Sequence, residues 1–350
     1  MATFKAGLVG VTGYAGMELA RLLTGHGQIE LVRATSRSDA GKTLCDLYPN
    51  LTGTCLAELV ITQPDPDDLA QACDIVFLAV PHGTAMDMAA QLLRRKVRVV
   101  DLSADFRLRD PEVYAQWYGL THREPELIKD AVFGLPELYA ERIKDAQLVA
   151  NPGCYPTSAI LGLYPALKAD LVDTSGIVID SKSGASGAGR GANVGSLFCE
   201  VSDSFRAYNL GKHRHTPEIE QELSVIAGQE LCVSFNTHLL PVNRGILSTT
   251  YTCLKKTLQL DDVIGLYSEA YSSAPWVRVL KRGILPETRW VRGTMFCDIG
   301  LVVDARTNRL IVVCAIDNLC RGASGQALAN ANLMLGLDVS TALNLAPLVP

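Results

Sequence analysis

The sequence lacks the features that mark membrane, secreted and nucleic-acid-binding proteins. No apolar run approaches the roughly 20 residues needed to cross a bilayer. The N-terminus MATFKAGLVG carries a single lysine before a glycine, unlike a signal peptide. Basic residues are not in excess, since 32 Lys and Arg stand against 37 Asp and Glu, for a net charge of -5. Such a chain has no electrostatic attraction to nucleic acids or anionic membranes, so we expect a cytoplasmic protein that binds neither.

Paired cysteines are also missing. The ten cysteines are scattered along the chain without a C-x-x-C pair, and no set of Cys and His residues has structural-zinc spacing, so we expect reduced thiols and no bound metal. What the sequence does have is length and apolar residues. With 350 residues, 48% hydrophobic and 20% charged, it can form two soluble domains, each with its own core.

Short apolar runs alternate with helical patterns in the first half of the chain. Strands are predicted at residues 4–11, 29–36, 73–81 and 97–104, and helices at 17–26 and 84–96. Strands that alternate with helices predict a parallel, doubly wound α/β sheet of the Rossmann type. We assign residues 1–150 to this domain.

Longer strands with period-two character follow, as at residues 245–254, 297–304 and 309–317. They predict a mixed or antiparallel sheet, so we assign residues 151–320 to an α+β domain. The last helical pattern, GASGQALANANLMLGL, has no obvious place in that sheet. We expect this C-terminal segment, about 321–350, to pack back onto the first domain.

The stretch GLVGVTGYAG contains Gly10, Gly13 and Gly16 between the first predicted strand and the first helix. Glycines let the backbone approach a pyrophosphate, and the helix N-terminus supplies amide donors. This turn therefore predicts a nucleotide site, to which we also assign Thr12 and Tyr14. A strand-helix turn can also use glycine for steric reasons alone.

The end of the second strand indicates which nucleotide is bound. NAD-binding domains usually carry an acidic residue there, whereas this chain has Ser36 and Arg37. A hydroxyl and a cation suit the 2′-phosphate of NADP(H), although nearby Asp39 leaves NAD open. Pro81 and His82 of AVPHG, which end a further strand, are assigned to the nicotinamide side as positional contacts.

The stretch NPGCYPT places Cys154 in a turn between an apolar run and a helical pattern. A helix N-terminus lowers a thiol's pKa from about 8.5 toward neutrality, so the position indicates a nucleophile. GKHRHTPEIEQEL supplies His213 and His215 as candidate bases before a predicted helix with Thr216 as N-cap and Pro217 at N1. We favour His215 as the acid/base and His213 as a substrate contact, and the reverse assignment stays open.

The motifs taken together resemble the N-acetyl-gamma-glutamyl-phosphate reductase family of the aspartate-semialdehyde dehydrogenase superfamily. Those that carry the resemblance are GVTGYAGMEL, DLSADFRL, FGLPEL, NPGCYPT, SGASGAGR, HRHTPEIEQEL, HLLPVNRGILSTTY and IDNLCRGASGQALANANLMLG. The resemblance implies NADPH-dependent reduction of N-acetyl-gamma-glutamyl phosphate to the semialdehyde and phosphate in arginine biosynthesis. Cys154 would form a thioester that hydride then reduces, with a histidine handling the proton. It also implies a homo-oligomer, either a dimer or a tetramer.

The substrate phosphate needs a cation, and DLSADFRLRD supplies Arg107 after a strand of the first domain. A guanidinium can hold phosphate with two parallel hydrogen bonds, and the superfamily resemblance indicates the same arginine, whereas Arg109 is interpreted as solvated. The same motifs assign further substrate contacts to Asn151, Ser183 and Gly184, and further cofactor contacts to Ser186, Gly187 and Asn318.

Three alternatives remain open from the sequence. The substrate could be aspartyl phosphate or an aminoadipyl-type acyl phosphate, which sister enzymes of the superfamily use. The chain could be a non-catalytic NADP-sensing regulator, although such a protein would tend to lose Cys154. It could also be a structural subunit of a larger pathway complex.

Overall fold

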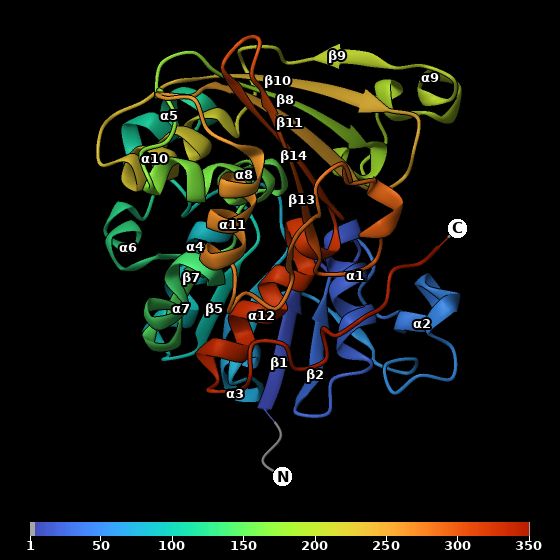
Figure 1. Cartoon of the computed structure of the whole chain (residues 1–350). Helices are drawn as coiled ribbons and strands as arrows, with labels where there is room; N and C mark the ends of the chain where they lie inside the picture. Colours follow the sequence, from blue (N-terminus) through green and yellow to red (C-terminus); the bar gives the residue numbers. More distant parts are fainter. Residues whose placement is uncertain (1–3, 350) are drawn as a thin grey trace. The chain divides into compact units, whose positions relative to one another are not determined.

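The computed structural model describes residues 4–349, which form two compact units (Figure 1). The first unit runs to Pro152 and takes up Ala323–Asn344, and the second consists of Gly153–Gly322 with the chain from Leu345 onward. Within the predicted C-terminal segment, only Gly325–Met334 forms an α-helix. The last residues of the chain thus belong to the second unit and not to the first.

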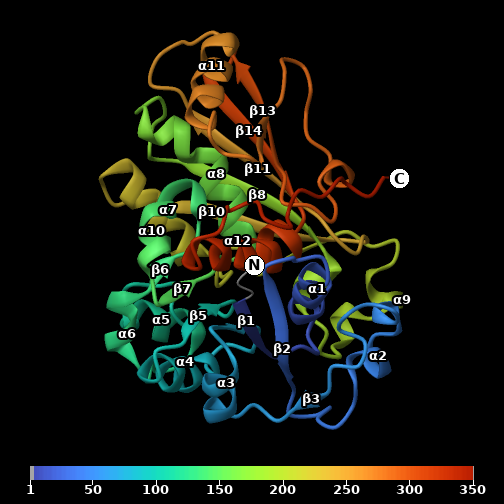
Figure 2. The same ribbon diagram turned by 90° about the horizontal axis from the view of Figure 1, so that it is seen from below.

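The first unit is built on a seven-stranded sheet (Figure 2), and all pairs of neighbouring strands in it are parallel. Its order is β3-β2-β1-β4-β5-β7-β6. The strands are β1 Phe4–Val9, β2 Ile29–Thr35, β3 Ile61–Thr62, β4 Ile75–Leu78, β5 Arg98–Asp101, β6 Val132–Phe133 and β7 Leu148–Ala150. The winding direction reverses between β1 and β4, and open α/β sheets bind their ligands at such a switch point.

Helices cover both faces of this sheet. They are α1 Tyr14–Leu23, α2 Leu44–Leu47, α3 Pro66–Ala72, α4 Ala85–Arg94, α5 Pro111–Tyr118, α6 Pro125–Asp130, α7 Pro136–Asp145 and α12 Gly325–Met334. On one face α12 contacts α1, α7 and β5, while α3 and α4 contact each other on the opposite face. Every residue of α12 is buried, as expected for a helix that is packed all round.

The second unit contains a seven-stranded mixed sheet of order β12-β13-β14-β11-β8-β10-β9. Its strands are β8 Ile177–Gly184, β9 Arg206–Tyr208, β10 Val233–Leu240, β11 Ile246–Cys253, β12 Val277–Val279, β13 Cys297–Asp304 and β14 Arg309–Ile316. β8 pairs with β10 and β12 with β13 in parallel, and the other pairs are antiparallel. The helices are α8 Cys154–Lys168, α9 Phe198–Val201, α10 Thr216–Ala227 and α11 Leu260–Ala270.

Helix α8 lies on this sheet against β11 and β14, and it also contacts α10 and α11 (Figure 1). Ser158 of α8 shares a hydrogen bond of 2.8 Å with Ser248 of β11, which lies 2.7 Å from Ser181 of β8. These buried hydroxyls satisfy one another, which a buried polar group requires. They hold α8, and with it the position of Cys154, against the sheet.

The predicted fold class is confirmed, with a parallel doubly wound sheet and a second unit with a mixed sheet. The starts of α1 and α10 differ from prediction in ways that bear on the site. α1 begins at Tyr14 rather than residue 17, because Gly13 is extended and serves as its N-cap. Thr216 was predicted as the N-cap of α10 but is its first residue, so Pro217 stands at N2 rather than at N1. His215 is the N-cap, because its carbonyl accepts the N–H of Ile219 at 3.1 Å.

None of the helices within residues 4–349 combines the length and the apolar character that crossing a membrane requires.

Candidate active site

Gly10 and Gly13 lie between β1 and α1, and Gly16 lies in the first turn of α1; the three positions are glycine for different reasons. Gly10 has a φ of +89°, and a Cβ there would overlap the carbonyl oxygen of Ala79. A Cβ on Gly16 would overlap the carbonyl oxygen of Gly10, so both positions are glycine because the fold requires it. A Cβ on Gly13 would have only one atom within 4 Å, Gly10 O at 3.8 Å.

Packing within the protein therefore explains the glycines at positions 10 and 16, but not the glycine at position 13. Gly13 lies at the N-cap of α1, directly before Tyr14, where backbone amides and the helix dipole favour an anion. The turn fits the pyrophosphate of a dinucleotide, because a side chain at Gly13 would restrict the approach of that group.

Hydroxyl groups gather where β2 ends, beside the glycine turn. The Oγ of Ser36 lies 3.4 Å from Oγ1 of Thr12 and 3.3 Å from Oγ of Ser38. Ser36 is 6% exposed, whereas Arg37 next to it is exposed. The structure thus brings together Thr12 and Ser36, two of the predicted cofactor residues, with a cation adjacent in the chain.

Asp39 is the acidic residue because of which NAD remained a possible cofactor. Its carboxylate already accepts hydrogen bonds from other side chains of the protein. It accepts hydrogen bonds of 2.7 Å from both Ser38 Oγ and Lys42 Nζ. Its charge is balanced by this lysine, so the loop offers hydroxyl groups and the guanidinium of Arg37 rather than a bare carboxylate. This arrangement suits a phosphate better than a ribose hydroxyl.

His82 lies in the loop after β4, next to the exposed Pro81. Its Nδ1 accepts the N–H of Ala104 at 3.1 Å, and its ring packs edge-on to Tyr118 with 5.2 Å between centroids. In the neutral ring the proton is then on Nε2. His82 is thus held in one orientation after a strand that borders the switch point, as a positional contact requires.

Arg107 is buried, with 6% of its surface exposed, whereas Arg109 is exposed. Its Nε donates to the carbonyl of Asn151 and its Nη2 to the carbonyl of Leu102, both at 2.8 Å. The structure thus brings together two predicted substrate residues, Arg107 and Asn151, after β5 and β7 of the first unit. The grip of Arg107 on phosphate stays a prediction.

Cys154 is the first residue of α8, with Gly153 as the N-cap, whereas the sequence predicted it in the turn just before this helix. The N-terminal end of a helix stabilises negative charge, and that favours a thiolate at this position. Gly322 lies so close that a Cβ there would be 2.6 Å from the Cβ of Cys154. The cysteine is therefore held between a helix N-terminus and a backbone segment without side chain.

The two predicted histidines lie at the start of α10, and α10 packs against α8. A direct link joins the two helix starts, because the N–H of Gly153 donates to Oε1 of Glu218 at 2.7 Å. Glu218 lies in the first turn of α10 and is 1% exposed. The candidate nucleophile Cys154 and its candidate bases, far apart in the sequence, are thus at the same end of two paired helices.

Tyr155, the residue after Cys154, contacts both histidine rings. Its ring centroid lies 5.2 Å from that of His213 and 5.9 Å from that of His215. Its hydroxyl lies 2.7 Å from that of Tyr208. Burial, the neighbouring Tyr208 and the charge of Cys154 raise the pKa of Tyr155, so this phenol remains protonated beside the cysteine.

His213 is neutral in this environment. Burial, together with the positive charge of Arg214, lowers its pKa to about 4. Its Nδ1 accepts the N–H of His215 at 3.1 Å, so the ring proton is on Nε2, which can donate to a ligand.

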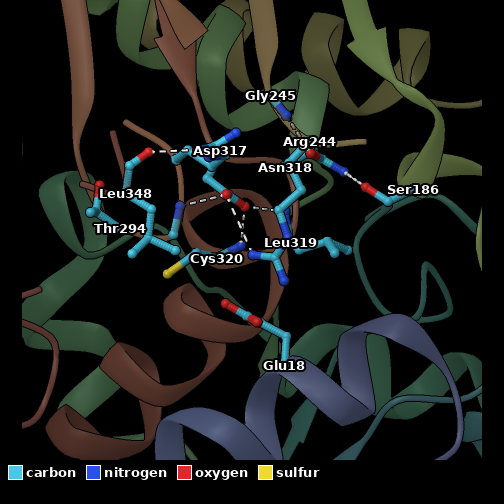
Figure 3. A network of polar contacts seen from close by, with 12 residues as sticks. Glu18, Ser186, Arg244, Gly245, Thr294, Asp317, Asn318, Leu319, Cys320 and Leu348 are labelled. Atoms are coloured by element: carbon cyan, nitrogen blue, oxygen red, sulfur yellow. Dashed lines mark hydrogen bonds and ion pairs between the residues drawn. The ribbon is translucent and has the colours of Figure 1, made fainter. Parts of the chain in front are cut away.

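A second group of predicted residues meets at the end of β8, and Figure 3 shows two of them, Ser186 and Asn318. Nδ2 of Asn318 donates to Oγ of Ser186 at 3.0 Å, and Oδ1 of Asn318 accepts the N–H of Gly245 at 2.8 Å. The residues brought together in this part of the second unit are Ser183, Gly184, Ser186, Gly187 and Asn318. Their substrate and cofactor roles stay predictions.

The buried carboxylate of Asp317 organises the chain beside this group (Figure 3). It accepts the main-chain N–H groups of Leu319 and Cys320 at 2.8 Å and of Gly293 at 2.7 Å. The turn that carries Gly322 to Cys154 begins at Asp317, since the N–H of Gly322 donates to the main-chain carbonyl of Asp317 at 2.9 Å.

Sequence reasoning missed Glu218, Tyr155 and Tyr208. Glu218 follows the histidines within HRHTPEIEQEL, where a carboxylate in the first turn of a helix is ordinary, so its pattern alone does not distinguish it. Tyr155 directly follows Cys154 in the sequence, but the tyrosine and histidine residues that it contacts lie more than 50 positions further along the chain. Among residues 4–349, no group of three or more His, Cys, Asp and Glu side chains is placed to hold a metal ion.

Comparison with known proteins gives the same two-part division. Residues 5–146 match the model of the semialdehyde dehydrogenase NAD-binding domain, and residues 154–318 match that of the semialdehyde dehydrogenase dimerisation domain. Among solved structures, aspartate semialdehyde dehydrogenase with NADP from Candida albicans superposes with a TM-score of 0.73 at 19% identity, covering 95% of this chain and 99% of that one. Aspartate semialdehyde dehydrogenase II from Vibrio cholerae gives 0.72 at 15% identity, covering 96% and 99%.

The fold and the two matched domains define a semialdehyde dehydrogenase, an oxidoreductase with a nicotinamide-nucleotide domain and a dimerisation domain. Two curated relatives narrow this class. N-acetyl-gamma-glutamyl-phosphate reductase from Pelotomaculum thermopropionicum is 52% identical over 97% of both chains, and that from Desulfotalea psychrophila is 50% identical over 99% of both. The chain belongs to the N-acetyl-gamma-glutamyl-phosphate reductase family, which confirms the resemblance predicted from its motifs.

Proposed function

We propose that this protein reduces N-acetyl-gamma-glutamyl phosphate to N-acetyl-L-glutamate 5-semialdehyde and phosphate with NADPH, as a step of arginine biosynthesis. The observation that carries the proposal is the pairing of the N-termini of α8 and α10, where Cys154 and two histidines lie at the same end of the two helices. The family relationship supplies the substrate class.

Cys154 begins the reaction as a thiolate at the N-terminus of α8. Its sulfur attacks the acyl carbon, the bond from that carbon to the phosphate oxygen breaks, and phosphate leaves, so that a thioester of Cys154 remains. NADPH, when bound, supplies the hydride that reduces the thioester carbon. Breaking the carbon–sulfur bond then releases the semialdehyde and regenerates Cys154.

His215 donates a proton to the carbonyl oxygen during reduction and accepts it back when the carbon–sulfur bond breaks. As the N-cap residue of α10 it is held by the helix start. His213 is the substrate contact, because its lowered pKa keeps it neutral with a proton on Nε2. A neutral donor can orient a carbonyl or carboxylate oxygen without repelling the positive groups that hold phosphate.

The chain's own residues hold the remaining groups. Gly13 and the start of α1 hold the pyrophosphate, and Ser36 with Arg37 holds the 2′-phosphate of NADP(H). Arg107, oriented by two main-chain carbonyls, meets the substrate phosphate. A further part of the proposal is a homo-oligomer, since residues 154–318 match a dimerisation domain; the choice between dimer and tetramer, and the cytoplasmic location, stay predictions.

The alternative substrates, aspartyl phosphate and an aminoadipyl-type acyl phosphate, are less well supported. The aspartate semialdehyde dehydrogenases share the fold at 15–19% identity, whereas the relatives at about 50% identity carry the N-acetylglutamyl name. A non-catalytic regulator would not require Cys154 at the N-terminus of α8 next to the histidines at the start of α10.

The proposal is tested in the reverse direction, by following phosphate-dependent NADP reduction with N-acetylglutamate semialdehyde. We expect turnover with this substrate and at least tenfold lower kcat/KM with aspartate semialdehyde, a difference of about 1.4 kcal/mol in transition-state stabilisation. Omitting phosphate and replacing Cys154 by Ser are the controls. Higher kcat/KM with aspartate semialdehyde would contradict the substrate, and turnover without phosphate would contradict the acyl-phosphate chemistry.

A further inference from the structure

Asn330, in the middle of α12, makes an unusual pair of contacts for a buried side chain. It is 0% exposed, and its Nδ2 donates to the carbonyl of Gly134 at 2.9 Å and to Oδ1 of Asn151 at 3.1 Å. Its own Oδ1 is buried without a hydrogen-bond partner. Leaving this amide oxygen unsatisfied costs free energy. The two hydrogen bonds that Nδ2 donates must offset this cost, so they fix the side chain in this position.

The orientation of this amide follows from its partners. The carbonyl of Gly134 can only accept, so the nitrogen of Asn330 must face it. A Cβ on Gly134 would overlap this nitrogen. It would also overlap Cγ1 of Val149, so glycine at position 134 leaves room for both Asn330 and Val149.

Asn151 receives this contact, and all its other polar groups are engaged too. Its N–H donates to the carbonyl of Asp101 at 2.8 Å, and its Nδ2 donates to the carbonyl of Ala323 at 3.1 Å. Its carbonyl accepts from Nε of Arg107 at 2.8 Å. Asn151 thus links α12 directly to the guanidinium of Arg107.

We propose that Asn330 is a positioning residue for substrate phosphate: through Asn151 it sets the orientation of the Arg107 guanidinium. The inference rests on the proposed function, in which Arg107 meets that phosphate. Removing the side chain of Asn330 leaves Oδ1 of Asn151 without its donor from α12. Asn151 then shifts to find another partner, and the carbonyl that orients Arg107 moves with it.

The chain offers a matched control on the same helix. Asn332 is also 0% exposed, and its Nδ2 donates to the carbonyls of Val339 and Thr341 at 3.2 and 3.0 Å. Its Oδ1 lies 3.0 Å from Nε2 of His26. Asn332→Ala therefore removes a comparable buried amide from α12 without a direct contact to Asn151 or Arg107.

The experiment compares Asn330→Ala with Asn332→Ala in the phosphate-dependent reverse assay. Asn330→Ala should raise the KM for phosphate about three- to tenfold, the loss expected for one hydrogen-bonded link, with the KM for NADP unchanged. Asn332→Ala should lower the Tm by a similar amount but leave the KM for phosphate within about twofold. Equal phosphate KM values for the two variants would overturn the inference.

A double-mutant cycle identifies the route through Asn151. Asn151→Ala and Asn330→Ala should together raise the KM for phosphate no more than the larger single effect, whereas Asn151→Ala and Asn332→Ala should be additive. Additive effects in the first pair would show that Asn330 does not act through Asn151. If Asn330→Ala does not fold, Asn330→Ser, which keeps a polar group but is too short for both bonds, takes its place.

A second readout does not depend on turnover. Inorganic phosphate should raise the Tm of the wild type and of Asn332→Ala, but raise it much less for Asn330→Ala and for Arg107→Lys. An equal rise in Asn330→Ala and Asn332→Ala would overturn the inference even in a protein that is inactive with N-acetylglutamate semialdehyde. Absence of turnover in the wild type, with the Tm pattern as expected, would instead contradict only the proposed substrate.

Discussion

Cys154 combines partial burial with a position at the start of α8, and these two properties affect its reactivity in opposite directions. It is only partly exposed, whereas Cys55, Cys199, Cys232 and Cys253 are exposed. If access decided labelling, those four thiols would react first. The helix N-terminus favours the thiolate at Cys154, and the thiolate is the reactive form.

We therefore predict that iodoacetamide labels Cys154 before the exposed cysteines, as measured by mass spectrometry of partially labelled protein. Cys154→Ser should lose nearly all turnover with unchanged folding and NADPH binding, because an alkoxide forms far less readily than a thiolate. Cys253→Ser is the matched control and should retain activity. Normal turnover in Cys154→Ala would contradict the covalent mechanism.

Arg37 decides the choice of nucleotide if the loop after β2 holds the 2′-phosphate. Arg37→Ala should raise the KM for NADPH by about tenfold or more, since a charge-assisted hydrogen bond contributes about 1.5–3 kcal/mol. The KM for NADH should change little. Arg33→Ala, which breaks the ion pair of Arg33 in β2 with Asp68 in α3, is the control. Equal losses for both cofactors in Arg37→Ala would place the 2′-phosphate elsewhere.

At the level of secondary-structure elements, the site depends on segments that meet at the N-terminus of α8. One is the first turn of α10, joined through Glu218. Another is the turn at Gly322, where there is no room for a side chain next to Cys154. A methyl group at Gly322 would push this turn or the start of α8 away by the distance that a Cβ contact needs.

Gly322→Ala should thus slow both iodoacetamide labelling of Cys154 and turnover by about tenfold, because small displacements of a nucleophile have large effects on rate. Gly265→Ala is the control, since a Cβ there meets nothing within 4 Å and Gly265 lies within α11. That substitution should raise stability by about 0.5–1 kcal/mol. Unchanged labelling in Gly322→Ala would show that the turn tolerates the displacement.

At the scale of the whole molecule, two buried groups make stability depend on pH in opposite directions. Burial lowers the pKa of His213 to about 4 from 6.5, so the unfolded chain binds more protons in that interval and stability is lost as the pH falls through it. Burial, with the charge of Asp105, raises the pKa of Asp101 to about 7 from 3.8. Its contribution is present at low pH and lost as the pH rises toward 7.

His213→Asn should therefore reduce the loss of stability between about pH 6.5 and pH 4, measured by urea unfolding across that range. Asp101→Asn should make stability fall more steeply over this pH range, because the stabilising contribution of Asp101, which grows as the pH falls, is then missing. The half-buried His238 of β10 provides the control variant His238→Asn. If the acid loss is as large in His213→Asn as in the wild type, His213 is not the group that titrates.

Much of the molecule could be predicted from the sequence because it depends on local patterns. Alternating apolar runs and helical periods predict the parallel sheet of the first unit, and longer period-two strands predict the mixed sheet of the second. The glycine turn at Gly10, Gly13 and Gly16 and the helix start at Cys154 lie within a few residues of the features that identify them. The family, too, follows from the order of short motifs along the chain.

Tertiary structure decided what depends on residues far apart. The link from Gly153 to Glu218, the approach of Gly322 to Cys154 and the neutral state of His213 arise from packing between distant segments, which no local period encodes. The same holds for Asn330, which in the sequence is an ordinary polar residue of a helix. Only the burial of α12 within the first unit brings its amide to Asn151, because a hydrogen bond requires two groups at about 3 Å whatever their separation along the chain.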